Sequence, residues 1–247
     1  MSVTTAGQAS VCQVLIEDPG LAESVELSRR ERAIHECIAR CVRIPAGPWR
    51  WGESPDPHGL GLLVLDGLLI RRVAVDGRFG AELLGEGDIL RPWQEDIEPA
   101  TLRASSDWRV VDPTRVAVLD EQFSRLLGRY PRLAGCLMSR AVQRSRHLAV
   151  NMAIVHQARV DVRLHMVLWH LASRWGRVRG DGVAVPIRLT HTLLADLVAA
   201  RRPTVTTALR ELARQGVVRA VDDGWLLAGP PPGEFVSINH GAPPQLP

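Results

Sequence analysis

Six arginine and threonine side chains are crowded into residues 201–210 of the 247-residue chain: Arg201, Arg202, Thr204, Thr206, Thr207 and Arg210. An arginine guanidinium can bind phosphate oxygens or the O6 and N7 atoms of guanine, and a threonine hydroxyl can bind a phosphate or a base edge. No acidic residue occurs between Asp196 and Glu211, so the segment keeps its positive charge. These residue types at this spacing predict a surface that binds a nucleic acid.

Two short amphipathic helices joined by a tight turn would position these side chains. Thr190 is a favourable N-cap for the first helix, and Pro203 in the first turn of the second sacrifices no hydrogen bond. Gly216 would end the second helix as a left-handed cap, and two apolar runs around Asp223-Gly224 would form a hairpin. The predicted buried positions are Leu193, Leu194, Leu197 and Val198 in the first helix and Val205, Ala208, Leu209 and Leu212 in the second. Helix, turn, helix and hairpin together predict a winged helix-turn-helix.

Charge is divided unevenly along the chain. All 30 basic residues are arginines, and the formal net charge is +3. Up to Arg132 there are 16 arginines and 20 acidic residues, whereas from Leu133 onward there are 14 arginines and 7 acidic residues. High-GC codon usage would explain the preference for arginine over lysine, but it does not explain the loss of acidic residues. The basic second half is therefore expected to face a polyanion.

The first half of the chain is expected to form a β-roll. Residues 1–27 are weakly patterned and predict an irregular lead-in, and Ser28–Val42 predicts a helix capped by Ser28. From about residue 50 to 120, short apolar runs alternate with turn signals roughly every ten residues, which is typical of a jelly roll. Asp66-Gly67, Asp76-Gly77 and residues 85–88 are the expected turns, and Ala100–Ala104 and Val116–Leu119 are expected strands.

Helices are expected again after Asp120. Glu121–Leu127 predicts a short helix, and Val162–Trp175 predicts a longer one followed by a basic loop over 176–182. Between them, apolar residues repeat every seven positions, which favours a helix that pairs with a second copy; a long helix packed on its own domain is the alternative. That repeat consists of Ala134, Ala141, Leu148 and Val155, with Met138 and Met152 four residues after two of them.

On these motifs the chain resembles the CRP/FNR family of bacterial transcription regulators. The resemblance covers some forty residues of the helix-turn-helix, including Arg202-Pro-Thr-Val205 and the Gly216 cap, and the general layout of the chain agrees. It implies that Arg202 reads a base, that Thr204 contacts a phosphate, and that Thr206 and Thr207 face bases. Ala199 stands where the family has a turn glycine, which is tolerable if the turn avoids positive φ or the strain is modest.

The expected sensor departs further from the family. In its cyclic-nucleotide binders a glutamate holds the ribose and an arginine holds the phosphate. Here Pro92 follows the Gly87-Asp88 turn where that glutamate would stand, and Glu98 occupies the arginine position. Because a carboxylate repels a cyclic phosphate in a poorly solvated pocket, the sequence predicts no ordinary cAMP or cGMP binding.

Other chemistries have weaker support in the sequence. Cys37 and Cys41 are expected one turn apart on a helix as packing residues, and His165 and His170 lack a metal-binding spacing. We expect no catalytic site, no metal site and no cofactor. Composition is that of a globular protein, with no signal peptide and no membrane span, which predicts a cytoplasmic location.

The sequence thus predicts an α+β protein with five parts: an irregular lead-in (1–27), a jelly-roll β-sensor (28–130), a dimerisation helix (131–160), a winged helix-turn-helix (161–229) and a disordered tail (230–247). It predicts a homodimer that binds double-stranded DNA, with an unidentified small-molecule effector and RNA polymerase as further partners. The alternative is a ligand-binding or scaffolding protein in which the β-roll is active and the winged helix does not read DNA.

Overall fold

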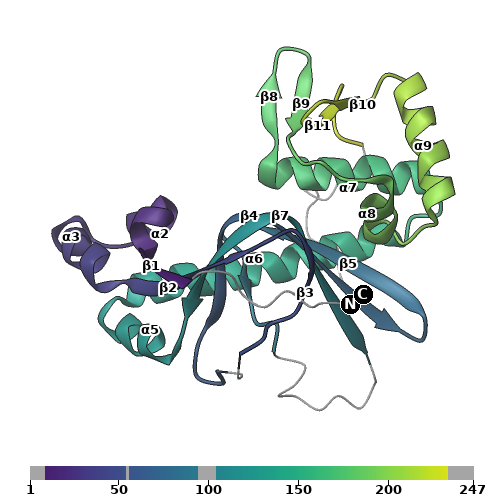
Figure 1. The fold of residues 1–247 in the computed structure, drawn as a ribbon. Helices are drawn as coiled ribbons and strands as arrows, with labels where there is room; N and C mark the ends of the chain where they lie inside the picture. The colour runs from purple at the N-terminus through teal and green to yellow at the C-terminus, as the bar shows by residue number, and fades with distance from the viewer. Residues whose placement is uncertain (1–8, 54–55, 94–103, 233–247) are drawn as a thin grey trace, which may run out of the picture. The chain divides into compact units, whose positions relative to one another are not determined.

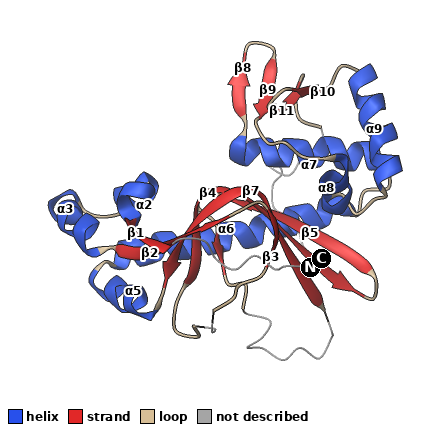
Figure 2. Cartoon of the chain, in the orientation of Figure 1, coloured by secondary structure: helices blue, strands red, loops and turns tan. Residues whose placement is uncertain are grey.

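The structure is a computed structural model that describes residues 9–53, 56–93 and 104–232. The chain divides into two compact units, residues 1–147 and residues 148–247 (Figure 1). The first contains a large antiparallel sheet with helices around it, and the second contains helices and a smaller sheet (Figure 2). This mixed α+β composition agrees with the fold class predicted from the sequence.

The sheet of the first unit is a β-roll built on two long strands, β4 (Gly61–Val75) and β7 (Ser105–Leu119). The strand order is β1-β2-β7-β4-β5, and the short strands β3 and β6 pair with β7 and β4. The other strands are β1 (Ala9–Gln13), β2 (Ile38–Ile44), β3 (Gly47–Trp49), β5 (Arg78–Gly85) and β6 (Ile89–Leu90). The predicted strand Val116–Leu119 is the end of β7, whereas most of Ala100–Ala104 lies outside the described residues.

Two of the three predicted turns are confirmed, and the third is wrong. Asp76-Gly77 connects β4 to β5 as a two-residue turn with both φ angles positive, and residues 85–88 form a tight turn. Asp66-Gly67 does not end a strand, because β4 runs through it with register irregularities against β7. Gly67 has φ +92°, and a Cβ there would lie 2.5 Å from the Pro113 carbonyl oxygen, so this glycine permits a bulge instead of a turn.

The predicted irregular lead-in is wrong for residues 9–27. This segment forms β1, α1 (Val14–Glu17) and α2 (Pro19–Glu23), and α3 (Leu27–Glu36) follows. Asp18 caps α2 by accepting a hydrogen bond from the Leu21 backbone N–H at 3.2 Å. Because β1, α1 and α2 are only four or five residues long, none of them has a periodicity from which it could be predicted. Tertiary packing stabilises them instead.

The predicted helix Ser28–Val42 is also wrong in extent. The helix α3 begins after Glu26, so Ser28 is not its N-cap, and it ends before Cys37. Ile38–Ile44 is strand β2, which places Cys41 opposite Ser10 of β1. Cys37 and Cys41 are therefore not neighbours on a helix. Pairing with β1 and β7 satisfies the backbone hydrogen-bonding groups of this segment. It therefore forms a strand although the spacing of its apolar residues predicts a helix.

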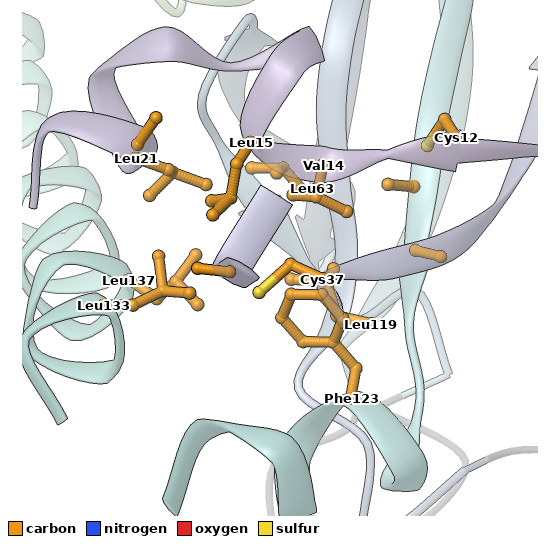
Figure 3. Packing of buried hydrophobic residues seen from close by; sticks show 14 of the residues in the cluster. Cys12, Val14, Leu15, Leu21, Cys37, Leu63, Leu119, Phe123, Leu133 and Leu137 are labelled. Atoms are coloured by element: carbon orange, nitrogen blue, oxygen red, sulfur yellow. The ribbon is translucent and has the colours of Figure 1, made fainter. Parts of the chain in front are cut away.

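One apolar cluster joins these helices to the β-roll (Figure 3). It combines Leu15 and Leu21 from the N-terminal segment with Leu63 and Leu119 from the long strands and with Phe123 of α5 (Glu121–Leu126). All four cysteines lie in or against this cluster. Burial raises the pKa of the Cys12 thiol to about 12 and that of Cys37 to about 11, so both stay protonated, as packing residues do.

The long helix predicted after residue 131 is α6 (Pro131–Val155), preceded by the 3-10 turn η1 (Leu127–Arg129). Two arginine–carboxylate pairs hold its first half to the first unit. Arg140 binds Asp18 through both guanidinium nitrogens, and Arg144 donates to Glu82 of β5. Of the predicted apolar repeat, Ala134 is half-buried against the core cluster, whereas Met138 and Met152, like Val142, are 62–66% exposed.

The second unit contains α7 (Val160–Trp175), α8 (His191–Leu197) and α9 (Arg202–Arg214) beside a four-stranded sheet of order β10-β11-β9-β8. The predicted hairpin is confirmed as β10 (Val218–Val221) and β11 (Gly224–Leu227). The predicted loop 176–182 is wrong, because Arg177–Arg179 (β8) pairs with Gly182–Val185 (β9) and β9 pairs with β11. Exposed arginines flank Val178 in β8, so this strand lacks the alternation of buried apolar and exposed polar residues that is typical of a strand.

Candidate DNA-binding surface

The helix α9 is held by one apolar face and leaves its N-terminal end exposed. The face consists of the four residues expected from the sequence, Val205, Ala208, Leu209 and Leu212, all at most 8% exposed. Pro203 lies in the first turn, where its missing N–H costs nothing, and Gly216 has the predicted left-handed φ of +74°. Because these four buried residues anchor the helix along one face, its remaining side chains point to solvent.

Three arginines at this surface form no ion pair within the described part of the chain. Arg201, Arg202 and Arg210 are exposed, and Arg201 is the N-cap residue. Arg214, one turn after Arg210, differs because its Nη2 donates to Glu211 Oε1 at 2.6 Å. Hydrogen bonds from Arg214 and Gln215 lower the pKa of Glu211 to about 2, so this carboxylate stays charged and keeps Arg214 neutralised. Two of the three unpaired arginines, Arg201 and Arg202, lie at the N-terminal end of α9, where the helix dipole adds to their positive charge, and Arg210 lies two turns further along the helix.

The threonines differ in what their hydroxyls can still bind. Thr204 and Thr207 are exposed, and Thr207 Oγ1 donates to the Pro203 carbonyl at 3.2 Å. Thr206 is half-buried and donates to the Arg202 carbonyl at 3.1 Å. Its oxygen also lies 2.9 Å from His191 Nδ1 at the start of α8. Two protein partners thus occupy the Thr206 hydroxyl, which leaves it less available than the sequence suggests.

His191 is the residue that sequence reasoning missed. It follows the Thr190 N-cap, which accepts from the Leu193 N–H at 3.2 Å as predicted. Its contact with Thr206 joins the first turn of α8 to the second turn of α9. The only signal in the sequence was a polar residue beside an N-cap, which is too common to identify a contact between helices.

The turn between the two helices is strained at Ala199. Its φ is +50°, so the turn does not avoid the left-handed region that favours glycine. Arg163 of α7 donates to the Val198 carbonyl at 3.2 Å and to the Ala199 carbonyl at 3.4 Å. These bonds satisfy backbone oxygens left open at the end of α8 and hold the turn in place.

Replacement of Ala199 by glycine is expected to stabilise the second unit by about 0.5–1 kcal/mol, because glycine reaches this φ without the Cβ penalty. Thermal unfolding should show a rise in Tm of a few degrees. Ala200→Gly is the matched control, since Ala200 does not have a positive φ. An equal or larger rise for Ala200→Gly would contradict the strain at Ala199.

The histidines of α7 serve packing. Trp169 Nε1 donates to His165 Nε2 at 3.1 Å, so that nitrogen is unprotonated, and burial lowers the pKa of His165. His170 is 9% exposed. Across the described residues there is no group of three or more His, Cys, Asp or Glu that could hold a metal ion. Within the same residues, no helix is long and apolar enough to cross a membrane.

Comparison with known proteins decides what this helix pair is. Residues 162–227 match the family model of the Crp-like helix-turn-helix domain. The chain is also 26% identical over 185 residues to the CRP-like cAMP-activated global transcriptional regulator of Mycobacterium tuberculosis, covering 72% of this chain and 79% of that protein. Residues 162–227 are therefore a Crp-like helix-turn-helix domain, and the chain is similar to a CRP-like transcriptional regulator over most of its length.

Two solved structures, those of CooA and FixK2, have a similar fold. A mutant of CooA from Carboxydothermus hydrogenoformans matches with a TM-score of 0.61 at 15% identity, over 91% of this chain and 95% of that one. FixK2 of Bradyrhizobium japonicum matches with a TM-score of 0.59 at 16% identity, over 83% and 99%. At these identities the likeness shows that this chain shares their fold.

Proposed function

We propose that this chain is a CRP/FNR-type transcription regulator that binds double-stranded DNA sequence-specifically, as a homodimer, through the N-terminal end of α9. The observation that carries the proposal is the set of unpaired, exposed Arg201, Arg202 and Arg210 on a helix whose other face is buried. In this arrangement a helix N-terminus can enter the major groove, where arginine reads guanine and backbone N–H groups meet phosphate. The exposed hydroxyls of Thr204 and Thr207 can contact a phosphate or a base. The Thr206 hydroxyl can do so only if it gives up one of its two partners within the protein.

The proposed dimer contact lies on α6. Met138, Val142 and Met152 are exposed, and with Ser145 and Ala149 they are spaced alternately four and three residues apart along the helix. This is the spacing of a coiled-coil seam, and exposed methionine and valine side chains gain stability when a second copy covers them. A dimer also presents two recognition helices to two half-sites, which supports the specific-binding proposal.

Val142→Glu is expected to shift the protein toward the monomer, because two like charges would then oppose each other in the seam. Analytical ultracentrifugation at micromolar concentration measures the change. Gln143→Glu is the matched control, because it places the same charge one residue away from the seam line. Dimerisation that survives Val142→Glu unchanged would overturn this assignment of the interface.

An allosteric role is the most economical account of the first unit. We propose that it binds an effector, that it does not bind cAMP in the ordinary way, and that RNA polymerase is a further partner at a promoter. In support, the sequence has Pro92 and Glu98 at the positions discussed above; Glu98 lies outside the described residues. Arg91 is not free to replace the missing phosphate-binding arginine, because its Nη2 already donates to the Pro57 carbonyl at 3.2 Å. A DNA-binding role requires a cytoplasmic location, and we assign no enzymatic activity or cofactor.

Selection of binding sites from a random duplex pool with the purified full-length protein tests the proposal. The expected result is an enriched sequence with two symmetric half-sites whose centres lie about 10 bp, one helical turn, apart. Failure to enrich any sequence at moderate salt would instead favour a protein whose β-roll is the active part. An asymmetric single site would contradict the dimer while leaving DNA binding intact.

A further inference from the structure

The three threonine hydroxyls of α9 differ in how many hydrogen-bond partners they have within the protein. Thr204 Oγ1 forms no hydrogen bond with any described residue, and Thr207 Oγ1 donates to one backbone carbonyl. Thr206 Oγ1 has two partners, the Arg202 carbonyl at 3.1 Å and His191 Nδ1 at 2.9 Å. The Thr206 hydroxyl is therefore the one most fully engaged before any DNA is bound.

The direction of the two hydrogen bonds at Thr206 follows from the number of hydrogens. A hydroxyl has one hydrogen and a backbone carbonyl can only accept, so Thr206 donates to the Arg202 carbonyl. His191 Nδ1 must then donate to Thr206 Oγ1, because the hydroxyl has no second hydrogen to give. The neutral ring protonated at Nδ1 and the imidazolium can both do this. His191 is thus a donor that holds the Thr206 hydroxyl in place.

The methyl group is the part of the Thr206 side chain that no hydrogen bond engages. The hydroxyl is held from two sides, by His191 of α8 and by the backbone of α9, and these two helices pack on each other (Figure 1). Rotation about the Cα–Cβ bond would move Oγ1 away from both partners, so the side chain keeps one rotamer. Thr206 is half-buried, so part of the side chain remains accessible.

Thr206 lies in a row of positive residues on α9. Arg202 and Arg210 lie four residues before and four residues after it, so the three side chains follow one another along the helix. Both arginines are exposed, and neither forms an ion pair with any described residue. When these arginines enter the major groove, the residue between them meets the base edges. Thymine is the base that presents a methyl group there, and a threonine methyl can pack against it.

We propose that Thr206 selects thymine through its methyl group, and that His191 is the positioning residue that keeps the hydroxyl away from the bases. Arg202 and Arg210 supply the charge around this contact, and Thr206 supplies an apolar group between them. The inference rests on the proposed function and deepens it, because it names a base and the chemical group that recognises it.

Replacement of thymine by uracil tests the contact, because the two bases differ only in this methyl group. Uracil replaces each thymine of the selected half-site in turn, and fluorescence anisotropy with the full-length protein measures the affinity. We expect one position at which the replacement weakens binding about fourfold per half-site, equivalent to about 0.8 kcal/mol for one buried methyl group. A selected site in which no such position exists would overturn the proposal.

Two variants of Thr206 separate the methyl group from the hydroxyl. Thr206→Ser removes the methyl group and should abolish the difference between thymine and uracil at that position. Thr206→Val keeps a methyl group, removes the hydroxyl and should retain the difference. Thr207→Ser is the matched control and should also retain it. The reverse pattern, with the difference kept in Thr206→Ser and lost in Thr206→Val, would show recognition by the hydroxyl and overturn the proposal.

Variants of His191 test its positioning role. His191→Asn keeps an N–H donor near the place of Nδ1, whereas His191→Phe keeps a ring without the donor. The difference between thymine and uracil should persist in His191→Asn and fall toward zero in His191→Phe, because the released Thr206 side chain can rotate. Binding to random duplex should be equal in the two variants, which separates positioning from a general loss of structure. Equal discrimination in both variants would contradict the role of His191.

The hydrogen bond itself can be measured without DNA. Nitrogen-15 NMR of the histidine side chains should show His191 protonated at Nδ1 in the wild-type protein and in Thr206→Ser, and His191→Asn identifies the signal by its loss. An unprotonated Nδ1 would overturn the assignment of His191 as donor. Failure to select any DNA site would refute the proposed function and leave this hydrogen bond standing, whereas a selected site without sensitivity to uracil would refute the thymine contact alone.

Discussion

Arg202→Ala is expected to weaken binding to the selected DNA site by about tenfold to a hundredfold for each half-site, equivalent to about 1–3 kcal/mol. Arg202 is the first residue of α9, it is exposed, and it forms no ion pair with any described residue. Its guanidinium is therefore free to bind a base edge without first breaking a contact within the protein. A dimer carries the substitution twice, so the total loss should approach twice the free energy of one site.

Fluorescence anisotropy with the selected duplex measures this loss, and Arg214→Ala is the matched control. Arg214 lies on the same helix, is equally removed from the core, and is neutralised by Glu211. Its replacement should change the affinity by less than about twofold. A competition with random duplex adds a second criterion, because loss of a base contact lowers the preference for the selected site, whereas loss of a phosphate contact weakens both duplexes alike. Equal losses of affinity for the selected duplex in Arg202→Ala and Arg214→Ala would contradict a contact between Arg202 and a base edge.

Leu15→Ala is expected to destabilise the first unit by about 2–5 kcal/mol. Leu15 is 2% exposed and lies in the apolar cluster with Leu63, Leu119 and Phe123, although it belongs to a segment without any sequence pattern (Figure 3). Replacing its isobutyl side chain by a methyl group opens a cavity that the surrounding strands only partly fill. Such a loss is a large part of the stability of a typical domain.

Urea unfolding compares Leu15→Ala with Ile16→Ala, its neighbour in the same short helix. Ile16 is 58% exposed, so its truncation should cost less than about 1 kcal/mol. The two variants remove similar volumes from adjacent positions and differ in burial alone. If both variants unfold at the wild-type midpoint, the N-terminal segment does not form part of the core.

The predictions that succeeded rest on local features of the sequence. In the winged helix-turn-helix, the Thr190 cap, Pro203 in a first turn and Gly216 as a left-handed cap each specify a helix end independently of the rest of the chain. The amphipathic spacing of α9 then fixes which side chains are buried, and so which are left at the surface. The exposure of Arg201, Arg202 and Arg210 could be predicted for this reason.

The predictions that failed concern segments whose structure depends on distant partners. Residues 38–44 have helical spacing, but β1 and β7 pair with them on both sides and make them a strand. Residues 177–179 have no strand pattern, yet they complete a sheet at the edge of β9. In both segments, backbone hydrogen bonding to strands remote in sequence decides the structure. The spacing of residues within the segment does not reveal this pairing.

The crowded arginines and threonines of residues 201–210 were sufficient to predict a nucleic-acid-binding surface, and the caps and apolar spacing around them predicted the helix-turn-helix that presents it. Only the tertiary structure distinguished the unpaired arginines from Arg214, placed Thr206 against His191, and joined Arg144 of α6 to Glu82 of β5. The physical reason is sequence distance. Caps, turns and amphipathic faces are made by residues within a few positions of one another, whereas Arg140 and Arg144 find their carboxylate partners, Asp18 and Glu82, tens of residues away.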